Sequence, residues 1–154
     1  MNDIEKLVAE NTIKKQLAHY CKGIDTKDWP LVRSCFGDNH EHQHGQFNGS
    51  LDEFVSFASS NMTHVSMSQH SLSNFIITIN DDGLSAKSEV SFHAVHLIDA
   101  SVTADLFFNI RGQDNDWIVL GSYIDQWIFE DGQWLIIKRN ARHNWERIEP
   151  SKGR

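Results

Sequence analysis

The order of two hydrophobic patterns along the chain constrains its fold more than any other feature. In the first part, apolar residues recur at helical spacing, as from Ile13 through Leu17 to Ile24. From Val65 onward, the chain reads as strand-like segments separated by turn signals such as Asp131-Gly132. Helices followed by consecutive strands predict an α+β fold, in which helices pack on a mostly antiparallel sheet.

Two helical stripes near the N-terminus differ in phase. Apolar residues stand at positions 4, 7 and 8 and resume at Ile13 on a different face, which predicts a break between the stripes. We expect Asn11 to cap the second helix and Gly23 to end it, because glycine adopts the left-handed C-terminal conformation most easily.

Further caps and turns predict the remaining elements. Asp28 should cap a short helix through about residue 36, with Pro30 in its first turn. Ser50 and Glu53 fit a capping box for a helix of about ten residues. One strand is expected near 38–47. The later strands are expected near 66–80, 84–98, 102–112, 116–130 and 133–145.

Length and composition limit the class of protein. The 154 residues suffice for one domain, expected over residues 1–149 with a disordered tail at 150–154. A net charge of -7 argues against binding nucleic acid, which needs a clustered basic surface. No apolar run reaches the roughly 20 residues of a membrane span, and the acidic N-terminus is unlike a signal peptide. We therefore expect a cytoplasmic protein in which Cys21 and Cys35 are buried thiols.

Loop lengths determine which side chains share a face of the expected sheet. A two-residue loop at Asp131-Gly132 would place Arg139 as the one charge on an apolar face. The opposite face would carry an aromatic patch, which predicts either a subunit interface or a covering layer of helices. That patch comprises Tyr123, Asp125, Trp127, Phe129, Trp134 and Ile136.

The hairpin around Asp82-Gly83 predicts a second set of neighbours. A short loop would pair Leu72 with His93 and place His70 diagonally beside His93, within reach of one small ligand. A longer loop or a β-bulge would change this register and can move His93 to the other side of the sheet.

The order and spacing of several short motifs resemble a known family. These motifs are Tyr20-Cys21-Lys22-Gly23-Ile24-Asp25, Asp28-Trp29, Cys35-Phe36, His70 with Asn74, Tyr123-Ile124-Asp125, Asp131-Gly132-Gln133-Trp134 and Arg139. Over about residues 3–145, the chain resembles the SnoaL-like branch of the nuclear-transport-factor-2-like superfamily. The resemblance implies a cone-shaped α+β fold with N-terminal helices on a curved sheet.

Within that branch, the chain is similar to hexachlorocyclohexane dehydrochlorinase, bile acid 7α-dehydratase and scytalone dehydratase. The resemblance implies a lyase, free of cofactor and metal, that eliminates water or a related group from a hydrophobic cyclic or polycyclic molecule. It places Asp25 and His70 as a dyad in which the carboxylate holds one imidazole nitrogen and the other nitrogen acts as general base. Tyr20 and Arg139 are implied to stabilise developing negative charge, and His93 to assist as an acid or orienting group.

The resemblance also implies a homo-oligomer, a trimer before a dimer. Two other functions stay open beside the lyase. An isomerase would use the same base and return the proton elsewhere, and a ligand-binding or scaffold domain would use the fold without catalysis.

A segment of alternating histidines departs from the resembling enzymes. His40, His42 and His44 would share one side of a strand, and His-x-His is a spacing found in metal sites. A metal-dependent enzyme is therefore a third class, although no further ligand stands at an obvious spacing. Alternatively, His42 and His44 line the mouth of a pocket and, together with Leu72 and Asn74, contact a polar substrate.

Overall fold

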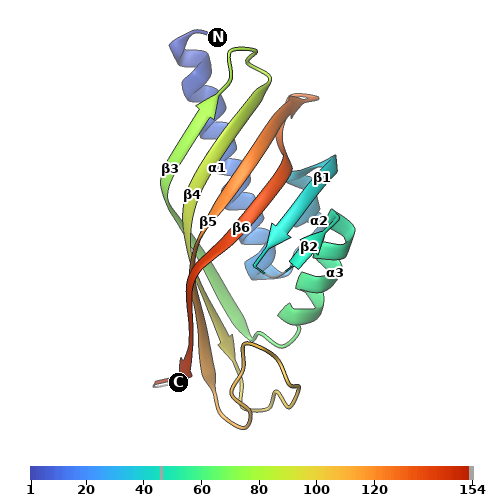
Figure 1. The fold of residues 1–154 in the computed structure, drawn as a ribbon, viewed down its shortest axis with the longest axis vertical. Helices are drawn as coiled ribbons and strands as arrows, with labels where there is room; N and C mark the ends of the chain where they lie inside the picture. The colour runs from blue at the N-terminus through green and yellow to red at the C-terminus, as the bar shows by residue number, and fades with distance from the viewer. Residues whose placement is uncertain (46, 153–154) are drawn as a thin grey trace.

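The fold consists of helices packed on one six-stranded sheet (Figure 1). The computed structural model describes residues 1–45 and 47–152, except for the side chains of Asn39 and His40. Its elements are α1 (Asp3–Thr26), α2 (Trp29–Ser34), β1 (Phe36–His44), β2 (Phe47–Gly49), α3 (Leu51–Met62), β3 (Met67–Ile79), β4 (Ser85–Ile98), β5 (Asn115–Glu130) and β6 (Gln133–Pro150). The predicted α+β class is confirmed.

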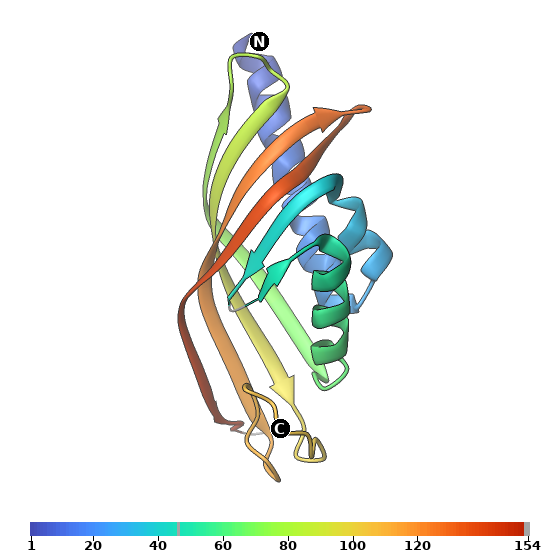
Figure 2. The same cartoon turned by 45° about the vertical axis from the view of Figure 1, so that its right-hand side comes forward.

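The strand order of the sheet is β2-β1-β6-β5-β4-β3. Strands β3 to β6 form an antiparallel meander, and β1 joins its edge by running parallel to β6. Figure 2 shows the long strands bending around the side on which α1 and α3 lie. The concave face of the sheet therefore carries the helices and the hydrophobic core. Among the described helices, none is both long and apolar enough to cross a membrane.

The first helix is continuous, so the predicted break at Asn11 is wrong. Asn2 and Glu5 form a capping box at its start, where backbone N–H groups lack partners within the helix. The first apolar stripe is uncovered: Ile4 is 73% exposed, Leu7 64% and Val8 61%. This stripe lies on a different face of α1 because the start of the helix extends beyond the core. The helix itself is not interrupted.

The predicted end of α1 at Gly23 is also wrong. The helix runs on to Thr26, and Lys27 takes the left-handed cap conformation with φ 58°. Gly23 serves close packing instead, because a Cβ there would lie 2.8 Å from Cγ2 of Val32 in α2. Asp25 thereby falls within the last turn of α1.

Several local predictions are confirmed. Asp28 caps α2 by accepting a hydrogen bond from the Leu31 backbone, and Ser50 with Glu53 forms the capping box of α3. Asp131 and Gly132 both have positive φ, 49° and 79°, as a two-residue type I′ hairpin requires. Cys21 and Cys35 are buried free thiols.

Two predicted boundaries in the second half are wrong. The segment 102–112 forms no strand; it belongs to a long loop between β4 and β5 that Asn109 and Asn115 tie together through their side chains. The last strand does not end near residue 145 but runs to Pro150, which pairs with Asn115, and the Ser151 backbone N–H donates to the carbonyl of Asp114. The disordered tail stays a prediction. Residues 153–154 lie outside the described part of the chain.

A β-bulge in β3 corrects the predicted pairing of Leu72 with His93. Near the turn, Ile79 pairs with Ala86, which is the register that a two-residue loop at Asp82-Gly83 would give. The connection between β3 and β4 is nevertheless longer than two residues. The register shifts between Ser73 and Ile76, where Asn74 has φ 51°. Beyond this bulge His93 pairs with Ser71, so it lies on the exposed convex face, opposite His70.

A second bulge, between β5 and β6, corrects the predicted faces of that hairpin. The register shifts between Gln126 and Trp127, so that Arg139 pairs with Asp125 on the concave face. The aromatic patch faces the core: Tyr123 and Trp127 are fully buried within the chain, and so are most other members. The helix layer covers it, and the patch gives no support to a subunit interface. The predicted trimer or dimer stays a prediction.

Candidate active site

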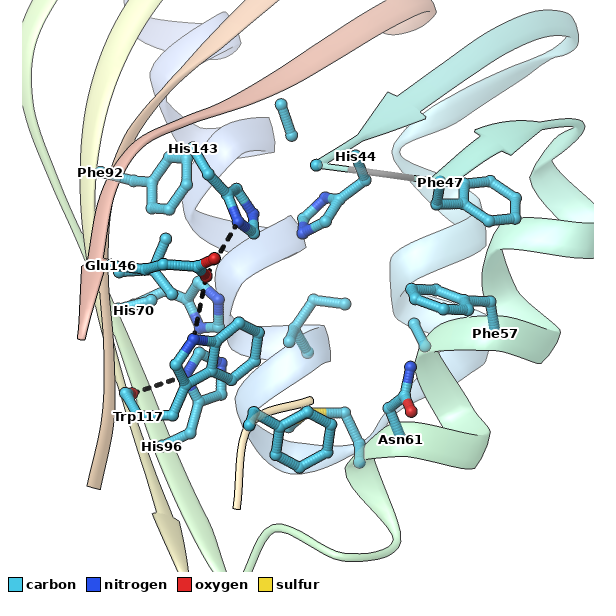
Figure 3. Close-up of a pocket in the computed structure, with 18 of the residues that line it drawn as sticks. His44, Phe47, Phe57, Asn61, His70, Phe92, His96, Trp117, His143 and Glu146 are labelled. Atoms are coloured by element: carbon cyan, nitrogen blue, oxygen red, sulfur yellow. Dashed lines mark hydrogen bonds and ion pairs between the residues drawn. The ribbon is translucent and has the colours of Figure 1, made fainter. Parts of the chain in front are cut away.

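A cavity of about 800 Å³ lies between the concave face of the sheet and helices α1 and α3 (Figure 3). Aromatic side chains supply much of its wall, including Phe54 and Phe57 from α3 and Trp117 from β5. Phe107 and Phe108 enter from the loop that was predicted to be a strand. The cavity is large enough for a ligand of several rings, since small-molecule sites span roughly 300–1,000 Å³.

Asp25 and His70 meet at the wall of this cavity. The Nδ1 atom of His70 lies 2.6 Å from Oδ1 of Asp25. A carboxylate can only accept here, so Nδ1 carries the proton and Nε2 keeps its lone pair. His70 lines the cavity and Asp25 lies behind it, at the end of α1. The hydrogen bond expected between them is therefore present.

Three groups hold the Asp25 carboxylate in place. Besides the His70 ring, the His70 backbone N–H donates to Oδ2 at 2.9 Å and the Ser68 hydroxyl donates to Oδ1 at 2.8 Å. Burial alone would raise the pKa of Asp25, but the hydrogen bonds from His70 and Ser68 outweigh it, and the pKa is lowered. The carboxylate is thus kept ionised beside the imidazole.

His96, and not His93, is the second histidine near His70. Its ring lies 5.3 Å from the His70 ring, edge to face, and it lines the cavity. Nδ1 of His96 donates to the carbonyl of Trp117 at 3.2 Å, while its ring stacks on the Trp117 indole. Burial lowers the pKa of His96 to about 3, so the ring is neutral at physiological pH. His93 is exposed on the other face, which contradicts its predicted place in the site.

Arg139 lies beneath the cavity and does not line it. Its guanidinium makes two hydrogen bonds to the Asp125 carboxylate, at 2.8 and 2.7 Å, and both side chains are fully buried. Its Cζ lies 4.2 Å from the ring centroid of Tyr20 and 4.3 Å from that of Tyr123. Arg139 does not reach the cavity, so this structure does not support the predicted direct contact between Arg139 and developing negative charge. Of this group Tyr20 lines the cavity, and burial raises its pKa, which keeps the phenol protonated.

The histidines of β1 have separate places. His42 is fully buried and stacks on Phe54, with ring centroids 3.6 Å apart, so it belongs to the core and not to the pocket mouth. His44 does line the cavity. The side chain of His40 lies outside the described residues. In the part of the chain that is described, no three histidine, cysteine or acidic side chains are grouped to hold a metal ion.

Neither Leu72 nor Asn74 lines the cavity. Leu72 packs against the hydrophobic core, and Asn74 is exposed at the bulge of β3. Their predicted substrate contacts are therefore not supported by where they lie. Asn74 instead supplies the positive φ that sets the register of His70.

The SnoaL-like domain model matches residues 5–140. The chain belongs to the SnoaL-like domain family. No curated protein matches it in sequence. Its fold resembles that of a protein from Novosphingobium aromaticivorans, provisionally assigned as a scytalone dehydratase, with TM-score 0.80, 18% identity and coverage of 98% of this chain and 94% of the other.

Two further solved structures share the fold of this SnoaL-like domain. The hexachlorocyclohexane dehydrochlorinase LinA-type3 from Novosphingobium barchaimii has TM-score 0.76 and 14% identity, over 96% of this chain and 94% of the other. A nuclear transport factor 2-like superfamily protein from Salmonella enterica has TM-score 0.71 and 16% identity, over 96% and 94%. The nuclear-transport-factor-2-like fold expected from the sequence is confirmed.

Among the cavity residues of this SnoaL-like domain that the sequence did not predict are His96, Trp117, His143 and Glu146. His96 was not predicted because the bulge in β3 decides which residues of β4 lie on the same face of the sheet as His70. Trp117 was not predicted for the same reason, since it pairs with His96. His143 and Glu146 lie in the last part of β6, and the predicted strand ends at residue 145, before β6 does. A signal was present for His96: the residues Phe92, Ala94 and His96 share the period-two spacing of a buried face.

Proposed function

We propose that this SnoaL-like domain is a lyase that needs no cofactor and eliminates water, or a related leaving group, from a hydrophobic cyclic or polycyclic molecule. The observation that supports this proposal most strongly is the hydrogen bond of 2.6 Å between Asp25 and His70 at the wall of a large aromatic cavity. The dehydratase and dehydrochlorinase named among the solved structures agree with this choice of reaction.

In the proposed reaction, Nε2 of His70 removes a proton from a carbon of the substrate. The electron pair of that C–H bond forms a C=C bond, and the leaving group departs with the electrons of its own bond to carbon. Asp25 holds the tautomer that leaves Nε2 free and stabilises the imidazolium as it forms. Tyr20, neutral because burial raises its pKa, donates a hydrogen bond to the oxygen on which negative charge develops.

Arg139 acts indirectly in this scheme. The guanidinium lies against the face of the Tyr20 ring and opposes the rise of its pKa, so it makes the phenol a better donor than burial alone would. Isomerisation would begin with the same proton abstraction and differ in where the proton returns. Binding without chemistry would leave the substrate carbon untouched.

These three functions can be separated with hydroxylated and keto-bearing ring compounds in D₂O. We expect wild-type protein to produce a dehydrated product, observed by mass spectrometry, or deuterium at the attacked carbon. His70→Ala should lower the rate by roughly 10²–10⁴-fold, the usual share of a general base. His93→Ala is the matched control, because it removes an exposed histidine from the same part of the sheet and should leave the rate unchanged.

Three outcomes would replace the lyase with another function. A rearranged isomer that has lost no leaving group, with or without deuterium, would favour an isomerase. Bound compounds that show neither product nor deuterium would favour a binding domain. If His70→Ala turns a substrate over at the wild-type rate, the dyad is not the base.

A further inference from the structure

A second cluster of polar side chains lines the cavity and has no role in the proposed reaction. Trp117 and His143, from β5 and β6, meet the carboxylate of Glu146 at the cavity wall (Figure 3). The indole N–H of Trp117 donates to Oε2 of Glu146 at 3.1 Å. Nδ1 of His143 lies 3.6 Å from the same oxygen, which is within ion-pair distance. The Glu146 side chain is 49% exposed, so its carboxylate lies where the cavity opens to solvent and is accessible to a ligand.

The atoms left free in this group are acceptors. Among the described residues, none donates a hydrogen bond to Oε1 of Glu146. Burial lowers the pKa of His143 although Glu146 opposes the shift, so the ring is mostly neutral near pH 7. In the tautomer whose Nδ1–H faces Glu146, Nε2 of His143 retains a lone pair. The free acceptor at Oε1 of Glu146 favours a ligand group that donates a hydrogen bond.

The surroundings also disfavour an anion. Burial lowers the pKa of His44, whose ring lies 5.2 Å from His143, and burial likewise keeps His96 neutral. The buried cation Arg139 is already paired with Asp125 and does not line the cavity. Arg142 does line it, but its side chain is exposed to solvent and the carboxylate of Glu146 offsets its charge at the cavity.

We propose that Glu146 and His143, held by Trp117, form a subsite that binds a hydroxyl group of the substrate, and that the substrate is a neutral hydroxylated ring compound and not a carboxylic acid. This subsite deepens the proposed lyase function by naming its substrate class. The hydroxyl donates to Oε1 of Glu146 or Nε2 of His143, while the rings pack on the aromatic wall. A carboxylate ligand would meet Glu146 as a like charge.

Three naphthalenes of equal ring size test the selection without a known substrate. 2-Naphthol can donate, 2-methoxynaphthalene can only accept, and 2-naphthoate is an anion. Binding is measured by NMR titration of protein labelled in its histidine rings, which reports His143 and His70 separately. Wild-type protein should bind 2-naphthol about tenfold more tightly than 2-methoxynaphthalene, because one hydrogen bond to a charged acceptor supplies that much. 2-Naphthoate should bind most weakly, and the signals of His143 should shift on binding 2-naphthol.

Variants identify the groups responsible. Glu146→Gln should abolish most of the preference for 2-naphthol, because the amide lacks the charge. Glu149→Gln is the matched control on the same strand, since Glu149 pairs with Arg147 outside the cavity, and it should keep the preference. His143→Phe should reduce the preference while keeping the cavity wall aromatic. These measurements concern binding alone, so failure of His70 as a base would not affect them.

The proposal is overturned by equal binding of 2-naphthol and 2-methoxynaphthalene, or by a preference that survives Glu146→Gln. Tighter binding of 2-naphthoate would overturn the substrate class. Failure of all three compounds to bind would also overturn it, because an open cavity with this subsite should accept a neutral phenol.

Discussion

At the scale of single residues, His96 carries the clearest link between burial and pH. Its folded pKa is about 3, while a histidine in an unfolded chain titrates near 6.5. Between these values the unfolded state binds a proton that the folded state does not bind. Stability should therefore be fully present above about pH 6.5 and fall as the pH drops toward 3.

This pH dependence can be measured by urea denaturation at several pH values between 7 and 4. His96 should contribute a slope of up to about 1.4 kcal/mol per pH unit, the limit for one proton. His96→Gln, which keeps a donor for the Trp117 carbonyl, should show a shallower decline than wild-type protein. His44 and His143 also have lowered pKa values and leave part of the slope in the variant. Parallel curves for the two proteins would contradict the assignment.

At the scale of elements, the bulge in β3 decides which residues face the cavity. Asn74 holds φ 51° there, a conformation that glycine adopts freely and a β-branched residue resists. Asn74→Gly should therefore be tolerated, whereas Asn74→Val should lower the free energy of unfolding by about 1–2 kcal/mol. Ser73→Val is the control, because Ser73 is exposed on the same strand without positive φ. Equal effects of valine at both positions in chemical denaturation would show that the backbone conformation is not responsible.

The helices and strands differ in how far the sequence predicts them. Caps such as Ser50 with Glu53, and the Asp131-Gly132 turn, are local signals whose hydrogen bonds form between near neighbours, and they were predicted correctly. The contact between Asp25 and His70 followed from a family resemblance, because no local signal relates residues so far apart. The bulges at Asn74 and beyond Gln126 were not predictable, since each depends on how two strands fit a curved sheet. A single bulge reverses a face, which explains the wrong places given to His93 and Arg139.

At the scale of the whole molecule, the concave face of the sheet serves both the core and the cavity. The aromatic residues of β5 and β6 form a base on which α1 packs, and Arg139 with Asp125 fills that base below Tyr20. Packing of α1 on this base fixes the position of its last turn, and thereby that of Asp25. The stability of the fold and the geometry of the dyad should thus depend on the same buried layer.

The aromatic patch therefore contributes to the stability of the folded chain itself. Trp127 is fully buried and its indole donates to the Ser88 hydroxyl at 2.8 Å. Trp127→Ala should lower the free energy of unfolding by about 3–5 kcal/mol, the usual cost of removing a buried aromatic side chain. The difference from wild-type protein should be the same at low and high protein concentration. Phe129→Ala is the control, since Phe129 belongs to the patch but is 38% exposed, and its cost should be smaller. Light scattering that shows Trp127→Ala folded but dissociated into smaller species would restore the subunit interface and contradict this account.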